Sequence, residues 1–268
     1  MEHIERNIVN MKVVILAGGR GTRISEESII RPKPMVEIGG NPIIWHIMKI
    51  YSYYGFNDFV VCCGYKGHMI KEYFVDYYIH QSDITVDLKN NDTVIHNNES
   101  EPWKVTLVNT GLETGTAGRV LKARKYIGEE PFLLTYGDGV SNVNIPKVIK
   151  FHKEHGKIAT ITAAKPAGRF GAININEKNE VLSFREKDVE DEAWVNIGFA
   201  VFNPEVYDYL DNESMLETKP YEKLTKASQM AAYKHSGFWS PMDTVRDKII
   251  LEERWQTGNA PWRIWEDD

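Results

Sequence analysis

The chain of 268 residues has only two cysteines, Cys62 and Cys63, and they are adjacent. Neighbouring residues of an extended strand point to opposite faces, so a disulfide between these two would be strained. No Cys/His spacing typical of a zinc site surrounds them. We therefore expect two small buried thiols, which is the usual state of free cysteine in a reducing compartment, and a cytoplasmic location.

Basic charge is also in short supply. The chain has 32 lysines and arginines against 38 aspartates and glutamates, a net charge of -6. Proteins that bind long nucleic acids usually have a basic surplus, so no nucleic-acid partner is expected. A local cluster of basic side chains on an acidic protein can still bind a small anion.

Long apolar runs are missing as well. No run approaches the roughly 20 residues of a membrane-spanning helix, so we expect no membrane partner. The first ten residues, "MEHIERNIVN", are polar and mixed in charge, unlike a signal peptide. We treat residues 1–10 as an N-terminal extension and expect one folded domain over residues 11–268.

Strand-like and helix-like segments alternate along the first 165 residues. Continuous apolar strands such as "KVVILAG" and "PFLLTYGDG" are separated by helical patterns such as 41–55, where Asn41 is the expected N-cap, and 145–156. This order predicts an α/β fold with a Rossmann-like, mainly parallel mixed sheet and helices on both faces. Residues 82–107 read as a hairpin insertion, and residues 166–268 as a smaller, more β-rich part.

A glycine turn, "AGGRGTR", follows the first strand. Gly18, Gly19 and Gly21 allow the backbone to approach a ligand and to point N–H groups at phosphate oxygens. The turn lacks the Gly-Lys-Ser/Thr of a P-loop, and Ile24 stands at the third glycine of a dinucleotide fingerprint. By itself the turn is equally compatible with a structural connection between a strand and a loop.

Two basic residues near the turn favour a phosphate site. Arg23 lies in the turn, and Lys33 is held between Pro32 and Pro34. Proline fixes its own backbone and restricts its neighbour, which suits a charge that must be preorganised.

Two carboxylates complete this pattern. Asp138 lies in a glycine turn at a strand end, and Asp243 precedes a helix. Each has a structural alternative, a turn-forming aspartate or a helix N-cap. Mg²⁺ prefers such hard oxygen ligands together with phosphate. With Arg23 and Lys33, the two carboxylates indicate metal-assisted phosphoryl transfer. Groups suited to a sugar and its phosphate follow at Gly171, Glu186, Lys187 and Asn196, although each also fits an ordinary surface position.

Several segments, read in order, resemble the sugar nucleotidyltransferases. They are "ILAGGRGTRISEESIIRPKPMVEIGGNPIIWHIM", "GYKGHMIKEYF", "VTLVNTGLETGTAGRV", "YGDGV", "GRFGA", "NIGF" and "GFWSPMDTVRDK". The resemblance covers the chain from Met11 to about Trp265. "RPKPMVEIGGNPIIWHIM", "WKVTLVNTG" and "GFWSPMDT" are similar to the cytidylyl branch, which makes CDP-sugars.

The resemblance implies a nucleotide-diphospho-sugar transferase fold, with a nucleotide-binding part at 11–165 and a sugar-phosphate-binding part at 166–268. It implies catalysis by Arg23 and Lys33, Mg²⁺ on Asp138 and Asp243, and a sugar phosphate on Gly171, Glu186, Lys187 and Asn196. The substrates would be CTP and a sugar 1-phosphate, glucose 1-phosphate first, and the assembly a homo-oligomer, a hexamer in the cytidylyl branch. The residues that would bind the nucleotide are Leu16, Ala17, Gly18, Gly19, Gly21, Thr22, Arg23, Thr114, Arg119 and Gly137.

The implied chemistry agrees with the poor supply of candidate bases. None of the eight histidines stands in a triad-like or metal-like arrangement. A sugar phosphate is already ionised at pH 7, so the nucleophile needs no general base. Positioning and neutralisation of charge are what an in-line phosphoryl transfer needs.

Two departures from the family pattern leave the acceptor open: Asp188 replaces the usual proline after Glu-Lys, and Ile197 replaces a glycine after Asn196. A third, "TGTAGR" where "TMTGGR" is usual, lies beside the expected CTP contact. A different hexose phosphate or an open-chain polyol phosphate would fit a reshaped pocket. A binding protein without catalysis and a nicotinamide-dependent dehydrogenase are the alternatives from other classes.

Overall fold

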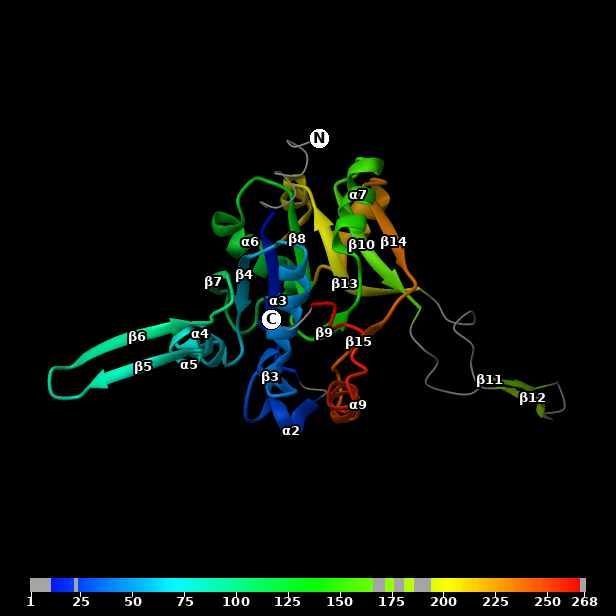
Figure 1. Cartoon of the computed structure of the whole chain (residues 1–268). Coiled ribbons are helices and arrows are strands. Elements are labelled where there is room, and N and C mark those ends of the chain that lie inside the picture. The colour runs from blue at the N-terminus through cyan, green and yellow to red at the C-terminus, as the bar shows by residue number, and fades with distance from the viewer. Residues whose placement is uncertain (1–10, 22–23, 166–171, 176–180, 186–193, 266–268) are drawn as a thin grey trace.

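We describe a computed structural model of the chain, over residues 11–21, 24–165, 172–175, 181–185 and 194–265. Within these residues a central sheet of seven strands forms the framework (Figure 1). In spatial order the strands are β14 (Met230–His235), β10 (Ala159–Ala164), β13 (Val195–Phe202), β8 (Phe132–Tyr136), β1 (Val13–Ala17), β4 (Asp58–Cys63) and β7 (Lys104–Asn109). β13 runs antiparallel to both its neighbours, and the other pairs are parallel.

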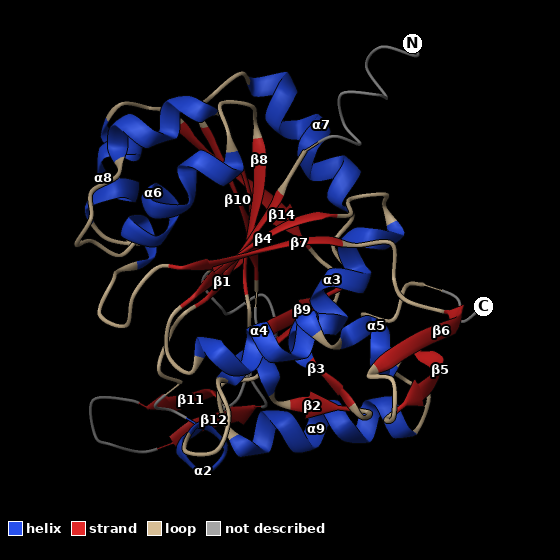
Figure 2. Ribbon diagram, turned by 90° about the vertical axis from the view of Figure 1, so that its left-hand side faces the viewer, coloured by secondary structure: helices blue, strands red, loops and turns tan. Residues whose placement is uncertain are grey.

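Both faces of this sheet are buried. Along β1, Val13, Ile15 and Ala17 pack into one core, whereas Val14 and Leu16 pack into the other. Such two-sided burial explains why the strand is continuously apolar. Helices α3 (Ile43–Tyr53), α7 (Ile145–His155) and α9 (Val245–Gln256) contribute to the first core, and α6 (Thr116–Ile127) and α8 (Lys219–Lys226) to the second (Figure 2). The predicted α/β class is confirmed.

The helix ends follow from local chemistry. The side chain of Asn144 accepts from the backbone N–H of Lys147 at the start of α7, and Gly156 with φ of +65° ends it. At α9, Thr244 and Asp247 form a reciprocal capping box. The predicted N-cap of α3 is wrong, because Asn41 pairs with Ile38 in a short ladder and Pro42 takes the N-cap position.

The smaller elements lie around this framework. A two-stranded hairpin of β5 (Ser82–Asp87) and β6 (Asp92–Asn98) projects from the body at the predicted insertion (Figure 1). The remaining elements are α2 (Ser25–Ser28), η2 (Lys33–Met35), β2 (Glu37–Ile38), β3 (Asn41–Pro42), α4 (Gly67–Val75), α5 (Tyr77–His80), β9 (Gly139–Ser141), β11 (Ala172–Ile175), β12 (Val181–Arg185), η4 (Pro204–Tyr209) and β15 (Trp239–Pro241).

The order of strands determines where a ligand can bind. β1 lies between β4 and β8 and is parallel to both, so the loops that follow these strands meet at one edge of the sheet. In open α/β sheets this edge is the usual binding crevice. β13 and β14 bring residues from beyond position 166 into the same sheet. The division into a nucleotide-binding and a sugar-phosphate-binding part stays a prediction.

Candidate active site

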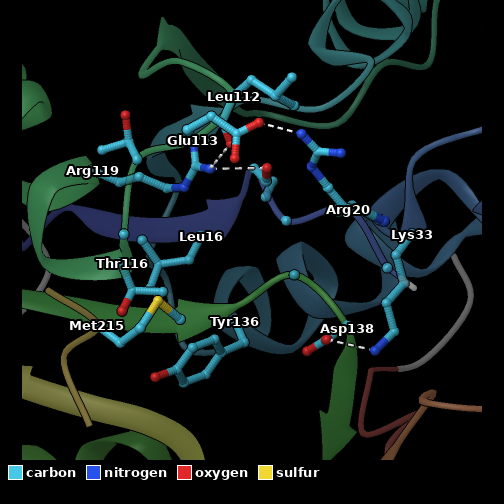
Figure 3. A pocket seen from close by; sticks show the side chains of 18 of the residues that line it. Leu16, Arg20, Lys33, Leu112, Glu113, Thr116, Arg119, Tyr136, Asp138 and Met215 are labelled. Atoms are coloured by element: carbon cyan, nitrogen blue, oxygen red, sulfur yellow. Dashed lines mark hydrogen bonds and ion pairs between the residues drawn. The ribbon is translucent and has the colours of Figure 1, made fainter. Parts of the chain in front are cut away.

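A cavity of about 560 Å³ opens at this edge of the sheet (Figure 3). The loops after β1, β7 and β8 form its walls, together with the loop before α8. Its volume is within the range of small-molecule sites. The lining residues are Leu16, Ala17, Gly18, Gly19, Arg20, Gly21, Lys33, Pro34, Leu112, Glu113, Thr114, Gly115, Thr116, Arg119, Tyr136, Gly137, Asp138, Glu213, Met215 and Asp243.

The glycine turn is required by the packing behind it. A Cβ atom on Gly18 would lie 2.2 Å from Nη1 of Arg119. Gly21 has φ of +62°, a left-handed conformation that favours glycine, and a Cβ there would lie 2.8 Å from the hydroxyl of Ser28. The turn therefore runs close to its supporting side chains, with its backbone along the cavity.

Arg119, on α6, joins two walls of the cavity. It is buried, with 4% of its surface exposed. Nη1 donates to Oγ1 of Thr110 at 2.6 Å and to the carbonyl of Gly111 at 2.7 Å, and Nη2 donates to the carbonyl of Gly18 at 3.0 Å. Burial lowers the pKa of its guanidinium, but an arginine stays charged at neutral pH. Arg119 thus holds the glycine turn and the loop after β7 in a fixed relation.

Thr114 is also engaged by its own loop. Its hydroxyl donates to the carbonyl of Thr110 at 2.7 Å and accepts from Nζ of Lys122 at 2.8 Å. These contacts fix the loop that lines the cavity opposite the glycine turn.

Lys33 is the centre of the charged end of the cavity. Pro32 is extended and Pro34 follows Lys33 at the start of η2, so the backbone is held on both sides. Its Nζ atom donates to Oδ2 of Asp138 at 2.7 Å and to Oδ1 of Asp243 at 2.6 Å. Burial alone would lower the pKa of Lys33, but the two carboxylates outweigh it and raise the pKa. Lys33 is therefore a fixed positive charge at neutral pH.

Asp138 and Asp243 fit a divalent cation. Both carboxylates reach the same ammonium group, so they converge on one small volume beside the cavity. Among the described residues no group of three or more His, Cys, Asp or Glu side chains forms a metal site. Mg²⁺ is usually bound by one or two carboxylates, with substrate phosphates and water as its other ligands. A pair of carboxylates at the end of a polyphosphate-sized cavity matches that pattern.

A second cavity of about 430 Å³ adjoins the first. Tyr136, Asp138 and Asp243 line both. Asn196 lines the second, and its Oδ1 accepts from the backbone N–H of Gly198 at 3.1 Å. Ile197 also lines it, but only 4% of this residue is exposed, because most of its bulk packs in the core.

The structure brings most of the predicted site residues together. Thr22, Arg23, Gly171, Glu186 and Lys187 lie outside the described residues, as does Asp188, and their roles stay predictions. Asn196 lies in the second cavity. The predicted residues that line the first cavity are Leu16, Ala17, Gly18, Gly19, Gly21, Lys33, Thr114, Arg119, Gly137, Asp138 and Asp243.

Further lining residues were not predicted. Tyr136 separates the two cavities and its hydroxyl donates to Glu217, which also accepts from Oγ1 of Thr116 at 3.4 Å. Arg20 lies within the glycine turn and forms an ion pair with Glu113. The motifs that contain Arg20 and Glu113 were usable signals, whereas Glu217 lies in a loop without a local pattern.

Comparison with known proteins identifies the family of the chain. The sequence from residue 12 to 267 matches the nucleotidyl transferase family. The chain belongs to that family and is an enzyme of the nucleotidyltransferase class, which confirms the resemblance and argues against a dehydrogenase.

Within this family, the chain is similar to glucose-1-phosphate cytidylyltransferases. The chain is 53% identical over 258 residues to glucose-1-phosphate cytidylyltransferase of Salmonella typhi, covering 96% of this chain and 100% of that protein. It is 44% identical over 257 residues to a probable glucose-1-phosphate cytidylyltransferase of Bacillus subtilis, covering 95% and 100%.

Solved structures are similar in fold. The crystal structure of HddC from Yersinia pseudotuberculosis has a TM-score of 0.66 at 23% identity, covering 91% of this chain and 99% of that one. That of apo UDP-glucose pyrophosphorylase has a TM-score of 0.65 at 16% identity, covering 92% and 98%. The predicted nucleotide-diphospho-sugar transferase fold is confirmed. In the described part of the chain, no helix has the length and apolarity to span a membrane.

Proposed function

We propose that this enzyme joins CTP and glucose 1-phosphate to give CDP-glucose and pyrophosphate. The observation that supports it most directly is the contact of Lys33 with both Asp138 and Asp243, at the junction of two adjoining cavities. The 53% identity to a glucose-1-phosphate cytidylyltransferase supports cytosine as the base and glucose as the sugar.

The two cavities match the two substrates. The larger, which follows the glycine turn, has room for the nucleotide, and the smaller, which contains Asn196, for the sugar phosphate. The residues common to both cavities then lie where the phosphates of the two substrates meet. An oxygen of the sugar phosphate would attack the α-phosphorus of CTP, and the bond from that phosphorus to the oxygen bridging to the β-phosphate would break. The electron pair leaves with pyrophosphate.

The residues of the chain contribute position and charge. Lys33 would bind an α-phosphate oxygen and neutralise the charge that gathers there during transfer. Arg119 keeps the backbone around the nucleotide in place. We assign Mg²⁺ to Asp138 and Asp243, where it would neutralise phosphate charge. No side-chain base is needed because the attacking oxygen is already ionised.

The decisive experiment is a substrate panel. Incubate the protein with Mg²⁺, each of the four common nucleoside triphosphates and each of several hexose and polyol phosphates, and follow the release of pyrophosphate. We expect release with CTP and glucose 1-phosphate. If pyrophosphate is released with CTP and another acceptor but not with glucose 1-phosphate, the enzyme uses a different sugar or polyol phosphate. That is the alternative suggested by Asp188 and Ile197. No release with any pair, but calorimetric binding of CDP-glucose, would select a binding protein without catalysis.

Two further predictions belong to this proposal. The assembly is a homo-oligomer, a hexamer by resemblance, which sedimentation velocity would test. The location is cytoplasmic, which agrees with the buried free thiols of Cys62 and Cys63.

A further inference from the structure

An ion pair joins two walls of the larger cavity. Nη2 of Arg20, in the turn after β1, contacts Oε1 of Glu113, in the loop after β7 (Figure 3). Both side chains line the cavity, and they are 55% and 74% exposed. The pair therefore links the loop after β1 to the loop after β7 beside the cavity.

Arg20 differs from the other described cations of this cavity. Arg119 is buried and donates to protein oxygens of two loops, and Lys33 is held between two carboxylates. Arg20 instead has an exposed carboxylate as its partner. An exposed ion pair between long side chains contributes little, because water screens it and ordering both side chains costs entropy. Its guanidinium can exchange partners at little cost.

A polyphosphate is the stronger partner. Guanidinium groups bind phosphate through paired, charge-assisted hydrogen bonds, and a triphosphate offers more charge than one carboxylate. Arg20 also adjoins the backbone of Gly19 and Gly21, the turn already suited to phosphate oxygens. A phosphate bound there would lie within reach of the Arg20 side chain.

We propose that Arg20 is an additional phosphate-binding residue of the nucleotide site and that Glu113 competes for it in the empty enzyme. This inference rests on the proposed function. When CTP enters, the guanidinium leaves Glu113 for a phosphate oxygen. When pyrophosphate leaves, Glu113 takes the guanidinium back. Glu113 thus weakens the binding of nucleotide and of pyrophosphate and favours product release.

Two roles of this ion pair can be distinguished: exchange of Arg20 between Glu113 and a phosphate, and a purely structural contact between the two loops. If the pair only held the loops together, removing either partner would weaken nucleotide binding in the same direction. If the partners are exchanged, Arg20→Gln weakens binding and Glu113→Gln strengthens it.

The experiment is calorimetric titration of the full chain with CTP and with pyrophosphate, each with Mg²⁺. We expect Arg20→Gln to raise both Kd values about tenfold, the loss of a charge-assisted contact, and Glu113→Gln to lower both about threefold. The double variant should behave like Arg20→Gln. The same variants should leave KM for glucose 1-phosphate within about twofold of the original enzyme.

A matched pair on the same protein serves as control. Arg124 and Glu129 also form an exposed ion pair, with 47% and 65% of their side chains exposed, and line neither cavity. Arg124→Gln and Glu129→Gln should leave both Kd values unchanged, and thermal unfolding checks that all variants fold.

Two outcomes would overturn the inference. They are Kd values of Arg20→Gln within twofold of the original protein, and weaker binding by Glu113→Gln. A chain that binds pyrophosphate but not CTP would contradict the proposed function instead, and Arg20 would then be tested with pyrophosphate.

Discussion

Lys33 and Asp138 are 105 residues apart in the chain, yet Nζ of the first lies 2.7 Å from Oδ2 of the second. The lysine is buried, and its Nζ atom also donates to Oδ1 of Asp243 at 2.6 Å. The ammonium group is therefore held beside the cavity before any phosphate arrives. This preorganisation gives a lysine an effect on a reacting phosphate that a mobile surface lysine lacks.

Replacement of this charge should be costly for turnover. We expect Lys33→Met to lower kcat by on the order of 10²-fold or more, because the developing charge on the phosphate loses its fixed partner. Stopped-time assays of pyrophosphate release give kcat. Lys150→Met, which removes an exposed lysine paired with Glu154 on α7, is the control and should leave kcat unchanged. Equal turnover in Lys33→Met would remove this residue from the mechanism.

Turnover should require a divalent metal ion, and the Mg²⁺ concentration it needs should depend on Asp138. Chelation of divalent cations with EDTA should abolish turnover, and added Mg²⁺ should restore it. We expect Asp138→Asn to raise the Mg²⁺ concentration for half-maximal rate about tenfold or more, because one of two carboxylate ligands loses its charge. Binding of Mn²⁺ followed by electron paramagnetic resonance gives a readout independent of activity. Asp58→Asn, at an exposed ion pair with Lys104, is the control and should bind Mn²⁺ like the original protein. Weaker Mn²⁺ binding in this control would show that the effect of Asp138→Asn is not specific to the proposed metal site.

Gly198 supports the wall between the two cavities. Its φ is +83°, and a Cβ would lie 2.3 Å from Cδ2 of Tyr136. We expect Gly198→Ala to displace this ring and to raise KM for the sugar phosphate. The variant should also lose roughly 1–2 kcal/mol of folding stability, because alanine is strained in a left-handed backbone conformation. Gly156→Ala isolates the backbone effect, because Gly156 has φ of +65° and nothing within 4 Å of a Cβ. If both variants lose stability but retain the same KM, Tyr136 does not shape the sugar site.

Stability at acid pH should depend on His46. Its Nε2 donates to the carbonyl of Ile38 at 2.8 Å, and its Nδ1 accepts from Nε1 of Trp262 at 3.4 Å, so the neutral ring is the form that both bonds require. Burial lowers its pKa to about 4. The unfolded chain therefore takes up a proton below about pH 6.5 that the folded chain refuses, and folding stability falls between pH 6.5 and pH 4, by about 3 kcal/mol.

Urea unfolding at several pH values measures this effect. We expect His46→Gln to unfold more easily at pH 7 but to lose less stability on acidification. The acid sensitivity that remains comes from groups such as His152 and His235, whose pKa values burial also lowers. If the free energy of unfolding of His46→Gln falls with pH as steeply as that of the original protein, the prediction is wrong. The ring would then be protonated in the folded protein, or the structure would open around it.

Local patterns made much of the fold predictable. β1 and α7 were readable because a buried strand is continuously apolar and because Asn144 and Gly156 mark the two ends of a helix. The insertion of β13 between β10 and β8 was not readable, since strand order depends on pairing between residues far apart. Asn41 failed as an N-cap because pairing with Ile38 competes for the same residue.

Some residues of the candidate site were also predictable from the sequence, and others were not. Residues inside short motifs, such as Lys33 and Asp138, could be proposed because charge, glycine and proline occur together in the sequence. Met215 and Glu217 could not, because their loop is brought to the cavities by tertiary packing. The replacement at Ile197 was expected to reshape the sugar pocket. Ile197 lines the second cavity but packs mostly in the core, and this division is set by the register of β13, which the sequence alone does not give.

The contact of Lys33 with Asp243 spans 210 residues. During synthesis on the ribosome, the first 242 residues can therefore emerge before Asp243 is available to Lys33, so the charged end of the cavity is completed only when the chain is nearly finished. Substrate binding is in this sense a test of completed folding. CTP, by binding the finished state alone, would shift the population of newly made chains toward it and away from proteolysis.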